Sequence, residues 1–508
     1  MPTVVQSRLK IGLEVHVELA TRTKMFTRVG NPAHAAYDDA PPNTLIDPVV
    51  LALPGSLPVI NREAVEMSML VGLALGCTIA PVTRWDRKNY FYADMPKNYQ
   101  ISQYDRPLCA DGSFELHLAD DSGAARTRRI GIIRAHLEED AGKLLHEAPG
   151  GAAIDHSIVD FNRAGTPLLE IVTAPDFDSA DEVVAFAQAL RTLCRHLGVT
   201  RGVMQKGHIR FEPNINCHLT LSDGRHVATP IVEVKNLNSF RSLRGAIDFE
   251  SREQPARFLE DQRKMGPNSK TTRGWDDVKE ITFVQREKED AHDYRYFPDP
   301  DLLPLVVGDE WRDAVRARLP ELPHLRAARY QRDFNLARKE ADALTDEPEV
   351  NHFYESAIAA AIEATIPAQR AGRLVANFIL QSGFKRANER NVLVHQLGIS
   401  PAQVAGIALL REGNLINSNA ADALFEALCA SDEEPRAAAE RLRLLQVRDD
   451  AALAAWCDQA IASNPAAASD VRAGKMQAVG RLVGEVMKLS GGNADAKAVR
   501  EALLERLK

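Results

Sequence analysis

One carboxylate in the middle of an apolar strand places the strongest constraint on how this chain folds. Glu170 lies in the run Leu168–Val172, which is bounded by Gly165-Thr166-Pro167 before it and by Pro175-Asp176 after it. A short apolar run between such turn residues is typical of a strand that protein covers well. A carboxylate in that setting is costly unless it is paired, hydrogen-bonded or bound to a metal. Two interpretations stay open: a structural ion pair with a residue such as Arg163, or a functional site to which other strands contribute.

Four more segments alternate between apolar and polar residues, as half-buried strands do. With the polar residues of one face in parentheses, they are Ile11–Leu19 (Glu14, His16, Glu18), Gly131–Glu138 (Arg134, His136, Glu138), His208–Cys217 (Arg210, Glu212, Asn214, Asn216) and Ile231–Leu237 (Glu233, Lys235). A solvated face of an antiparallel sheet explains one such strand. Several strands that each carry a carboxylate predict instead a sheet that lines a polar, metal-bearing pocket.

The chemistry of this predicted pocket follows from its donor atoms, which are oxygens in excess and an imidazole. Such a set suits Mg²⁺ or Mn²⁺ better than a thiolate zinc site. Mg²⁺ in turn suggests ATP, because proteins usually bind this ion through a few carboxylates plus substrate phosphates. The chain has neither a GxxxxGK[ST] loop nor a protein-kinase signature, so a nucleotide site here belongs to neither class.

Three polar stretches each allow a binding and a structural interpretation. Asp86–Asp105 carries lysines, including Lys88, and four tyrosines; it is an ordered surface hairpin or a loop that binds an anion. The run Glu138-Glu139-Asp140, followed closely by Lys143, either holds a cation and a phosphate or is simply solvated. Arg295 stands between two tyrosines and either contacts a ligand or stacks on its neighbours.

Composition narrows the class of protein. A net charge of −8 argues against a strongly basic nucleic-acid binder, although a local basic face stays possible. The six cysteines form no CxxC pair, which predicts a reduced, cytosolic chain. The N-terminus lacks an apolar signal core, and no apolar run is long enough to span a bilayer. We therefore expect a cytoplasmic protein without a membrane segment.

The organisation of the chain changes at about Leu305. Before it, strands alternate with two predicted amphipathic helices, Arg62–Gly76 and Val183–Leu197. After it, Ala and Leu become frequent and the apolar period is that of helices. We predict an α+β protein with an antiparallel-sheet domain at 1–305, a helical domain at 306–438 and a small helical tail at 439–508. The tail is locally basic, which fits a solvated helix face as well as RNA contact.

Six segments, taken in order, resemble the GatB family, the B subunits of the tRNA-dependent glutamyl/aspartyl amidotransferases. They are IGLEVHVEL, DRKNYFYADMPKNYQISQYD, HLEEDAGK, DFNRAGTPLLEIVTAPD, VEVKNLNSFRS and DYRYFPDPDL. The end of the chain is similar to the YqeY-like tail of that family. The resemblance implies a cradle-shaped N-terminal domain of the GatB/GatE type, a helical domain and a tail that binds tRNA.

The resemblance also implies a reaction. ATP phosphorylates the side-chain carboxylate of Glu-tRNA(Gln), and often of Asp-tRNA(Asn), with Mg²⁺ as cofactor. Ammonia then displaces the phosphate. The ammonia comes from glutamine that a partner amidase, the A subunit, hydrolyses, and it travels through an internal channel. The third chain is the small C subunit, which clasps the pair, so that the family forms GatCAB heterotrimers.

Site residues carry over from the resemblance by motif. Those matching the metal-linked set are Glu14, His16, Glu138, Glu170 and, at a position where the family is acidic, Glu233. Those implied for catalysis are Glu138, Glu170, Lys88 and Glu212, with Glu138 also the candidate gate for ammonia. Candidate contacts to phosphate or carboxylate groups are Lys88, Arg163, Lys235, Asn236 and Arg295.

The chain departs from the family in three places. It has no cysteine between Thr27 and Pro48, where many members carry CxxC pairs, so we expect no structural zinc. The family's S-x-R-C-D-x-N segment appears as His208–Asn214, which puts the role of Glu212 in question. The connection from Lys143 to Asp160 is long for the family and predicts a surface insertion.

Two other functions compete with the ligase subunit. One is a non-catalytic scaffold that docks tRNA, in which the carboxylates are only structural; the intact acidic set argues against it. The other is a free-standing metal-dependent hydrolase or small-molecule ligase. The long helical extension argues against that function, because a small substrate does not require it.

Overall fold

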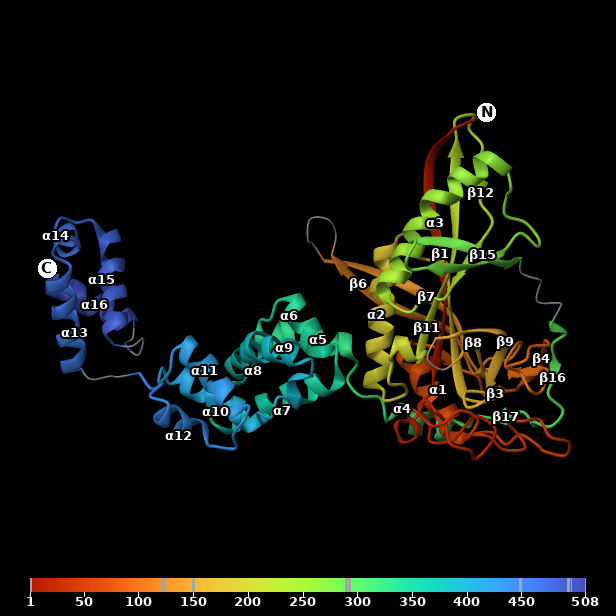
Figure 1. Cartoon of the computed structure of the whole chain (residues 1–508), viewed down its shortest axis with the longest axis horizontal. Coiled ribbons are helices and arrows are strands. Elements are labelled where there is room, and N and C mark those ends of the chain that lie inside the picture. The colour runs from red at the N-terminus through yellow and green to blue at the C-terminus, as the bar shows by residue number, and fades with distance from the viewer. Residues whose placement is uncertain are drawn as a thin grey trace. The chain divides into compact units, whose positions relative to one another are not determined.

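A large mixed sheet organises the first half of the chain in the computed structural model (Figure 1). The structure describes residues 2–119, 125–148, 151–287, 294–446, 450–490, 494 and 496–507. They divide into two units, Met1–Leu322 and Pro323–Lys508. The first unit is built on strands and the second on helices, so the predicted α+β class is confirmed. The predicted limits at 305/306 and 438/439 stay predictions, because this division has two parts rather than three.

Ten strands of the described residues form the sheet, in the order β15-β14-β13-β11-β1-β10-β7-β6-β2, with β12 paired to β11. Their bounds are β1 Val4–Glu18, β2 Thr78–Ile79, β6 Cys109–Ala119, β7 Ala125–Glu139, β10 Pro167–Thr173, β11 Ile209–Leu221, β12 His226–Ala228, β13 Val232–Lys235, β14 Thr271–Asp276 and β15 Ile281–Glu287. Neighbours pair antiparallel except β13 and β14, which are parallel because helix α3 (Phe240–Asp261) connects them.

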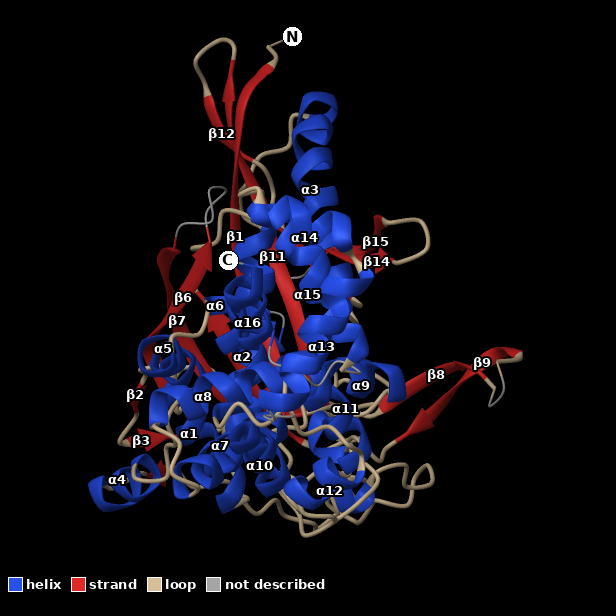
Figure 2. Ribbon diagram, turned by 90° about the vertical axis from the view of Figure 1, so that its left-hand side faces the viewer, coloured by secondary structure: helices blue, strands red, loops and turns tan. Residues whose placement is uncertain are grey.

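Smaller strands flank this sheet. They are β3 Val82–Thr83 with β17 Leu305–Val306; β5 Tyr99–Ser102, β4 Asp86–Asn89 and β16 Phe297–Pro298; and β8 Lys143–Glu147 with β9 Ala153–Asp160. The β8–β9 hairpin projects as a ribbon of its own (Figure 2). The predicted surface insertion between Lys143 and Asp160 has this form, with residues 149–150 outside the described part.

Helices cover the apolar face of the large sheet. On β1, the alternate residues Ile11, Leu13, Val15 and Val17 are at most 1% exposed and belong to one apolar core with residues of α1 (Arg62–Ala74), α2 (Ala180–His196) and α3. Phe186 of α2 packs edge-on against Phe114 and Phe177. The predicted helices at 62–76 and 183–197 are confirmed, with Asn61 and Ser179 as N-caps. Since side chains alternate along a strand, the opposite face of the sheet is left to polar residues.

A buried lysine holds the long loop that follows β1. Lys24 is 0% exposed, and its Nζ donates to the carbonyl oxygens of Leu45, at 2.7 Å, and Phe161, at 3.4 Å. Burial lowers the pKa of Lys24 to about 7, although the carboxylates of Asp47 and Glu139 act in the opposite direction. This loop contains the segment for which the sequence predicts no zinc, and that prediction stays untested.

Replacement of Lys24 by Met is expected to remove a rise in stability with pH. Folded Lys24 loses its proton near pH 7, whereas an unfolded lysine keeps it to about pH 10. Between these values the unfolded chain binds more protons, so raising the pH favours the folded state by up to about 1.4 kcal/mol per pH unit. The free energy of unfolding of wild type minus that of Lys24→Met should therefore increase from about pH 7 to about pH 9 in urea denaturation. Lys143→Met, at an exposed position, is the control; a constant difference for Lys24→Met would contradict the assignment.

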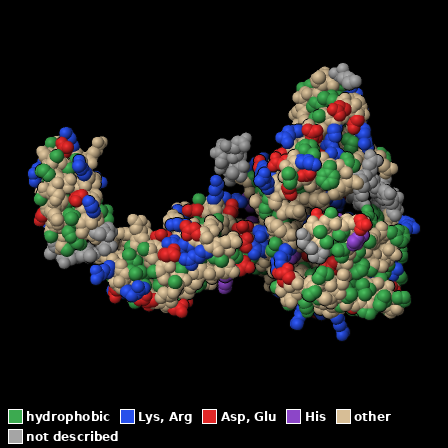
Figure 3. Space-filling view, viewed as in Figure 1, with side chains coloured by type: hydrophobic (Ala, Val, Ile, Leu, Met, Phe, Trp, Pro, Cys, Tyr) green, Lys and Arg blue, Asp and Glu red, His purple; other side chains and the backbone are tan. Residues whose placement is uncertain are grey.

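The second unit is helical, as the change of period predicts. Its helices are α5 Pro323–Phe334, α6 Arg338–Thr345, α7 Pro348–Glu363, α8 Ala368–Asn377, α9 Phe384–Arg390, α10 Pro401–Glu412, α11 Ser418–Leu428, α12 Pro435–Arg441, α13 Asp450–Ser463, α14 Pro465–Arg472, α15 Val479–Leu489 and α16 Ala496–Leu507; α4, Asp309–Arg316, belongs to the first unit. Their buried residues form two separate apolar clusters, one over α5–α12 and one over α13–α16. On the face shown in Figure 3, basic and acidic side chains are interspersed over these helices.

Two further findings bear on the class of protein. All six cysteines are buried and form no disulfide. Among the residues that the structure describes, no helix has the length and apolar character that crossing a membrane requires.

Candidate functional site

The register of four neighbouring strands gathers the predicted acidic residues on the polar face of the large sheet. His16 of β1 lies opposite Glu170 of β10, and Glu14 lies opposite Glu212 of β11. Glu170 in turn lies opposite His136 of β7. These residues are far apart in sequence, and strand pairing alone makes them neighbours. The polar strand faces are therefore grouped on one sheet as predicted, while the predicted metal stays a prediction.

The first cluster consists of His16, Glu138 and Glu170, which each offer one ligand atom within 4.8 Å of the others. His16 Nε2 is 3.5 Å from Glu170 Oε2 and 3.9 Å from Glu138 Oε1. His136 Nε2 lies at the same two distances from Glu170 Oε2 and Glu138 Oε2. Ser102 Oγ donates to Glu138 Oε2 at 3.1 Å. Glu170 thus has imidazole partners on both sides, which explains how a carboxylate survives in an apolar strand.

Burial and neighbouring charges set the protonation of this cluster. Burial and the carboxylate of Glu170 raise the pKa of Glu138, against the pull of Lys88. The pKa of Glu170 is held well below its usual range, because His136 and His16 outweigh its burial. Burial would lower the pKa of His16, but Glu212 and Glu170 raise it to about 9. Burial lowers the pKa of His136 to about 4. Without a bound cation, His16 carries the positive charge of the cluster and His136 is neutral.

The first cluster fits a divalent cation such as Mg²⁺ or Mn²⁺. Its donors are two carboxylates and one imidazole, with His16 Nε2 facing both carboxylates. The other ring nitrogen, His16 Nδ1, is buried with no hydrogen bond to the described residues and lies 3.8 Å from Glu212 Oε1. A metal-bound histidine usually donates its second N–H to a carboxylate or carbonyl oxygen, and Glu212 offers a carboxylate on that side of the ring, beyond hydrogen-bond distance.

The second cluster consists of Glu14, Glu212 and Glu233, which also bring their oxygens within 4.8 Å of one another. Two lysines lie among them. Lys235 Nζ is 2.6 Å from Glu212 Oε2 and 3.1 Å from Glu233 Oε1. Lys270 Nζ is 3.2 Å from Glu233 Oε2 and 3.6 Å from Glu14 Oε1. Burial would lower the pKa of Lys235, but Glu212 and Glu233 raise it well above its usual value.

Lys88 reaches the first cluster from the β4–β5 hairpin. Its Nζ lies 5.3 Å from the ring centre of Tyr294, within cation–π distance. Burial alone would lower the pKa of Lys88, but Glu138 and Glu170 hold it above its usual value. The segment contains an ordered hairpin, as the first interpretation predicts. The second interpretation, a loop that binds an anion, stays a prediction, and Lys88 is the cation that this segment brings to the site.

The structure does not support two of the interpretations that the sequence left open. The alternative partner of Glu170, Arg163, lies instead 3.6 Å from Asp140 and donates to the carbonyl oxygens of residues 141 and 142. The run at 138–140 is not one ligand group either. Glu139 pairs with Lys97 and accepts from a backbone N–H of β5, while Asp140 pairs with Arg210. Successive side chains of a strand point to opposite faces, so Glu138 and Glu139 cannot share a ligand.

Asn236 and Arg295 lie outside both clusters. Each is exposed and has a left-handed backbone, with φ of 65° and 46°. Among the described residues, no hydrogen bond or ion pair joins either side chain to a cluster. The backbone oxygen of Arg295 accepts from Asn89 at 2.9 Å. The predicted phosphate contacts of both residues stay predictions.

Sequence reasoning did not select two residues of the site. His136 stands two positions before Glu138, so the alternation that selected Glu138 contained the signal for it. Lys270 precedes β14 and reaches the second cluster only because β14 pairs with β13 in parallel. A pairing across a 22-residue helix leaves no local pattern in the sequence.

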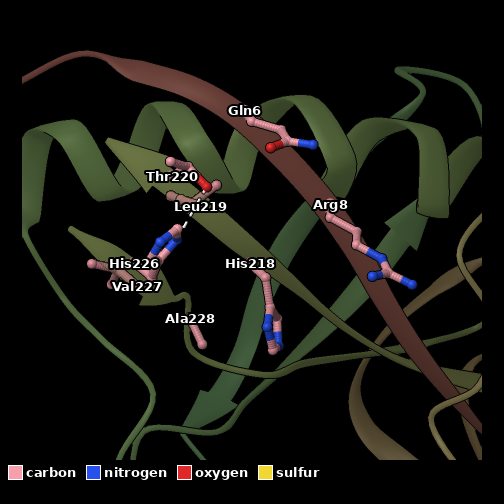
Figure 4. Close-up of a pocket in the computed structure, with 8 residues that line it drawn as sticks. All are labelled: Gln6, Arg8, His218, Leu219, Thr220, His226, Val227 and Ala228. Carbon is pink, nitrogen blue, oxygen red and sulfur yellow. Dashed lines mark hydrogen bonds between the residues drawn. The ribbon is translucent and has the colours of Figure 1, made fainter. Parts of the chain in front are cut away.

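A separate pocket of about 480 Å³ lies on the end of the sheet formed by β1, β11 and β12 (Figure 4). It is lined by Gln6, Arg8, His218, Leu219, Thr220, His226, Val227 and Ala228. His226 Nδ1 lies 3.2 Å from Thr220 Oγ1. Arg8 precedes Glu14 on β1 by about 20 Å of strand, so this pocket is distinct from the acidic clusters.

Comparison with known proteins gives the following similarities. The GatB/GatE catalytic domain matches residues 9–313, and the GatB domain matches residues 360–507. The B subunit of the aspartyl/glutamyl-tRNA(Asn/Gln) amidotransferase of Rhodopirellula baltica is 44% identical over 502 residues, which cover 97% of this chain and 96% of that protein. Its counterpart in Thermosynechococcus vestitus is 42% identical over 500 residues, covering 98% and 96%. The similarity therefore extends over nearly the whole of each chain.

Proposed function

The chain belongs to the GatB/GatE family, and from this premise we propose that it is the B subunit of an enzyme that amidates misacylated tRNA. The family resemblance predicted from the six ordered segments is thereby confirmed. The proposed substrates are Glu-tRNA(Gln) and Asp-tRNA(Asn), since the names of the relatives include both tRNAs. The proposed place of action is the cytoplasm, with the amidase (the A subunit) and the small C subunit as partners.

The proposed reaction has two balanced steps. A side-chain carboxylate oxygen attacks the γ-phosphorus of ATP, the bond to ADP breaks, and an acyl phosphate forms. Ammonia then attacks the acyl carbon, the carbon–phosphate oxygen bond breaks, and a base takes one proton from nitrogen. The products are the amide and inorganic phosphate. The acyl phosphate is required because an unmodified carboxylate offers only oxide as a leaving group.

The single observation that carries this proposal is the convergence of His16, Glu138 and Glu170 from three strands, with Lys88 beside them. Mg²⁺ bound there would neutralise negative charge on the phosphoryl group that is transferred. In the proposal, Lys88 and Lys235 contact phosphate oxygens, and Glu212 orients Lys235 through its 2.6 Å ion pair. In the same proposal Glu138, which is 2% exposed, gates the entry of ammonia.

Ammonium-driven amide formation tests the proposed function. The chain, co-purified with its amidase and small partner subunits, is given Glu-tRNA(Gln), ATP and Mg²⁺, with ammonium chloride in place of glutamine. Gln-tRNA(Gln) should form, and chelation of Mg²⁺ with EDTA should stop its formation. Because glutamine is absent, only the pocket of this chain is tested, not the glutaminase.

The scaffold function predicts a different result. A folded complex that binds Glu-tRNA(Gln) but forms no amide with ammonium, ATP and Mg²⁺ would favour it. Binding of tRNA is measured on the same preparation by filter retention, so that a failure to fold is recognised. The proposed role of the tail at 439–508 in tRNA binding is read from the same assay, with a chain that ends before α13.

A further inference from the structure

Two lysine ammonium groups lie between the carboxylates that a second metal ion would need. Lys235 and Lys270 contact opposite oxygens of Glu233, at 3.1 and 3.2 Å, and this carboxylate is 0% exposed. Lys235 reaches on to Glu212 and Lys270 reaches on to Glu14. Each acid of the second cluster therefore already has an ammonium partner.

From this arrangement we infer that Glu14, Glu212 and Glu233 hold the side chains of Lys235 and Lys270 instead of a metal ion. Lys270 in particular keeps a second divalent cation out of this cluster. The inference rests on the proposed function for the cation at the first cluster. It also differs from the family-derived assignment, in which Glu14 and Glu233 belong to one metal set with His16. In this chain the two acids hold lysines, and the metal set is reduced to His16, Glu138 and Glu170.

Coordination geometry supports this division. Mg²⁺ requires oxygen atoms at about 2.0–2.1 Å in a nearly octahedral arrangement. An ion held by these three acids would lie close to two ammonium groups, and their positive charges would repel it. An ion at the second cluster would have to displace Lys235 from Glu212, where the pair is 2.6 Å apart, and Lys270 from Glu233. At the first cluster, no lysine of the described residues lies within ion-pair distance of Glu138 or Glu170. The nitrogen atoms close to these two carboxylates belong to the imidazoles of His16 and His136, a group that binds metals.

The charges of the two clusters and of the three lysines beside them agree with this division. The five carboxylates of the two clusters carry five negative charges, and Lys88, Lys235 and Lys270 carry three positive ones. The carboxylates thus exceed the lysines by two, which matches the charge of one divalent cation. Removing Lys270 restores one negative charge next to Glu14 and Glu233, and it leaves room for a second cation there.

The test counts bound Mn²⁺, which gives an electron paramagnetic resonance signal when free. The full chain, in complex with its partner subunits and without ATP or tRNA, is titrated with Mn²⁺. We expect the Lys270→Gln variant to bind one Mn²⁺ per chain more than wild type. The double variant Lys270→Gln with Lys235→Gln should bind this additional ion more tightly. Lys270→Arg keeps the charge and should bind as wild type does. Lys279→Gln, at a position 72% exposed, is the matched surface control.

The outcomes separate this inference from the proposed function. Equal Mn²⁺ counts in wild type and in both Lys270→Gln variants, in protein that melts at the same temperature, would overturn the inference. So would a second Mn²⁺ in wild type that disappears in Glu233→Gln. His16→Ala should remove one Mn²⁺ from every variant; if it removes none, the proposed metal at the first cluster fails, while the extra ion of Lys270→Gln still supports the lysine-filled site.

Discussion

Glu170→Gln is expected to lower kcat/KM for ammonium-dependent amidation by about 10³-fold or more, while tRNA binding stays within about twofold of wild type. The amide keeps the shape of the carboxylate but removes the charge that lies between two imidazoles, with His16 Nε2 and His136 Nε2 both at 3.5 Å. The neutral glutamine amide is a poorer ligand for the cation than the carboxylate, and it is a weaker partner for His16. Both changes act on the charge that develops during phosphoryl transfer rather than on docking of tRNA.

The measurement is single-turnover formation of Gln-tRNA(Gln), with tRNA binding and the melting temperature recorded on the same preparations. Glu147→Gln, an exposed position on β8, carries the same chemical change away from the site and should be indistinguishable from wild type. Glu170→Asp keeps the charge but withdraws it by one methylene, so its activity should lie between those of wild type and Glu170→Gln. A Glu170→Gln enzyme within about threefold of wild type would remove this residue from the chemistry.

Much of the fold and of the site could be predicted because β-strands have a strict two-residue period. Ile11–Leu19 shows its apolar and polar faces in the sequence, and the structure places them accordingly. The period also assigns Glu14 and His16 to one face. It does not say which strands are neighbours, and the pairing of β1 with β10 and β11 is what brings His16 to Glu170 and Glu212. The resemblance to a known family supplied the grouping that the period alone lacked.

Where prediction failed, the cause is a contact that no local pattern records. Arg163 is near Glu170 in sequence, yet it lies before β10 and turns toward Asp140. Lys270 joins the second cluster through a parallel strand pair across α3, so its sequence neighbourhood resembles an ordinary loop. A run of charged residues misleads because neighbours in sequence need not share a site. Glu138 and Glu139 are adjacent in sequence, but their side chains point to different faces of the strand.

Lys88→Met is expected to lower kcat for amidation by about 10²-fold with a smaller change in KM for tRNA. The ammonium group of Lys88 interacts with Glu138 and Glu170 and lies against Tyr294. In the proposed reaction it faces the phosphoryl group as negative charge moves from ATP to the new acyl phosphate. Methionine fills a similar volume beside the tyrosine but carries no charge, so packing is retained and the electrostatic contribution is lost.

The structural alternative is that Lys88 only compensates the two buried carboxylates. If so, Lys88→Met should lower the melting temperature and tRNA binding together with kcat, because buried carboxylates without a counter-charge destabilise the sheet. If Lys88 acts on the phosphoryl group, kcat falls in a complex with normal melting temperature, and Lys88→Arg restores part of it. Lys143→Met, exposed on β8, controls for loss of a lysine. Both roles predict a lower kcat, and they differ in whether the melting temperature and tRNA binding fall with it. The β4–β5 hairpin belongs to the active site only if the kinetic effect stands alone.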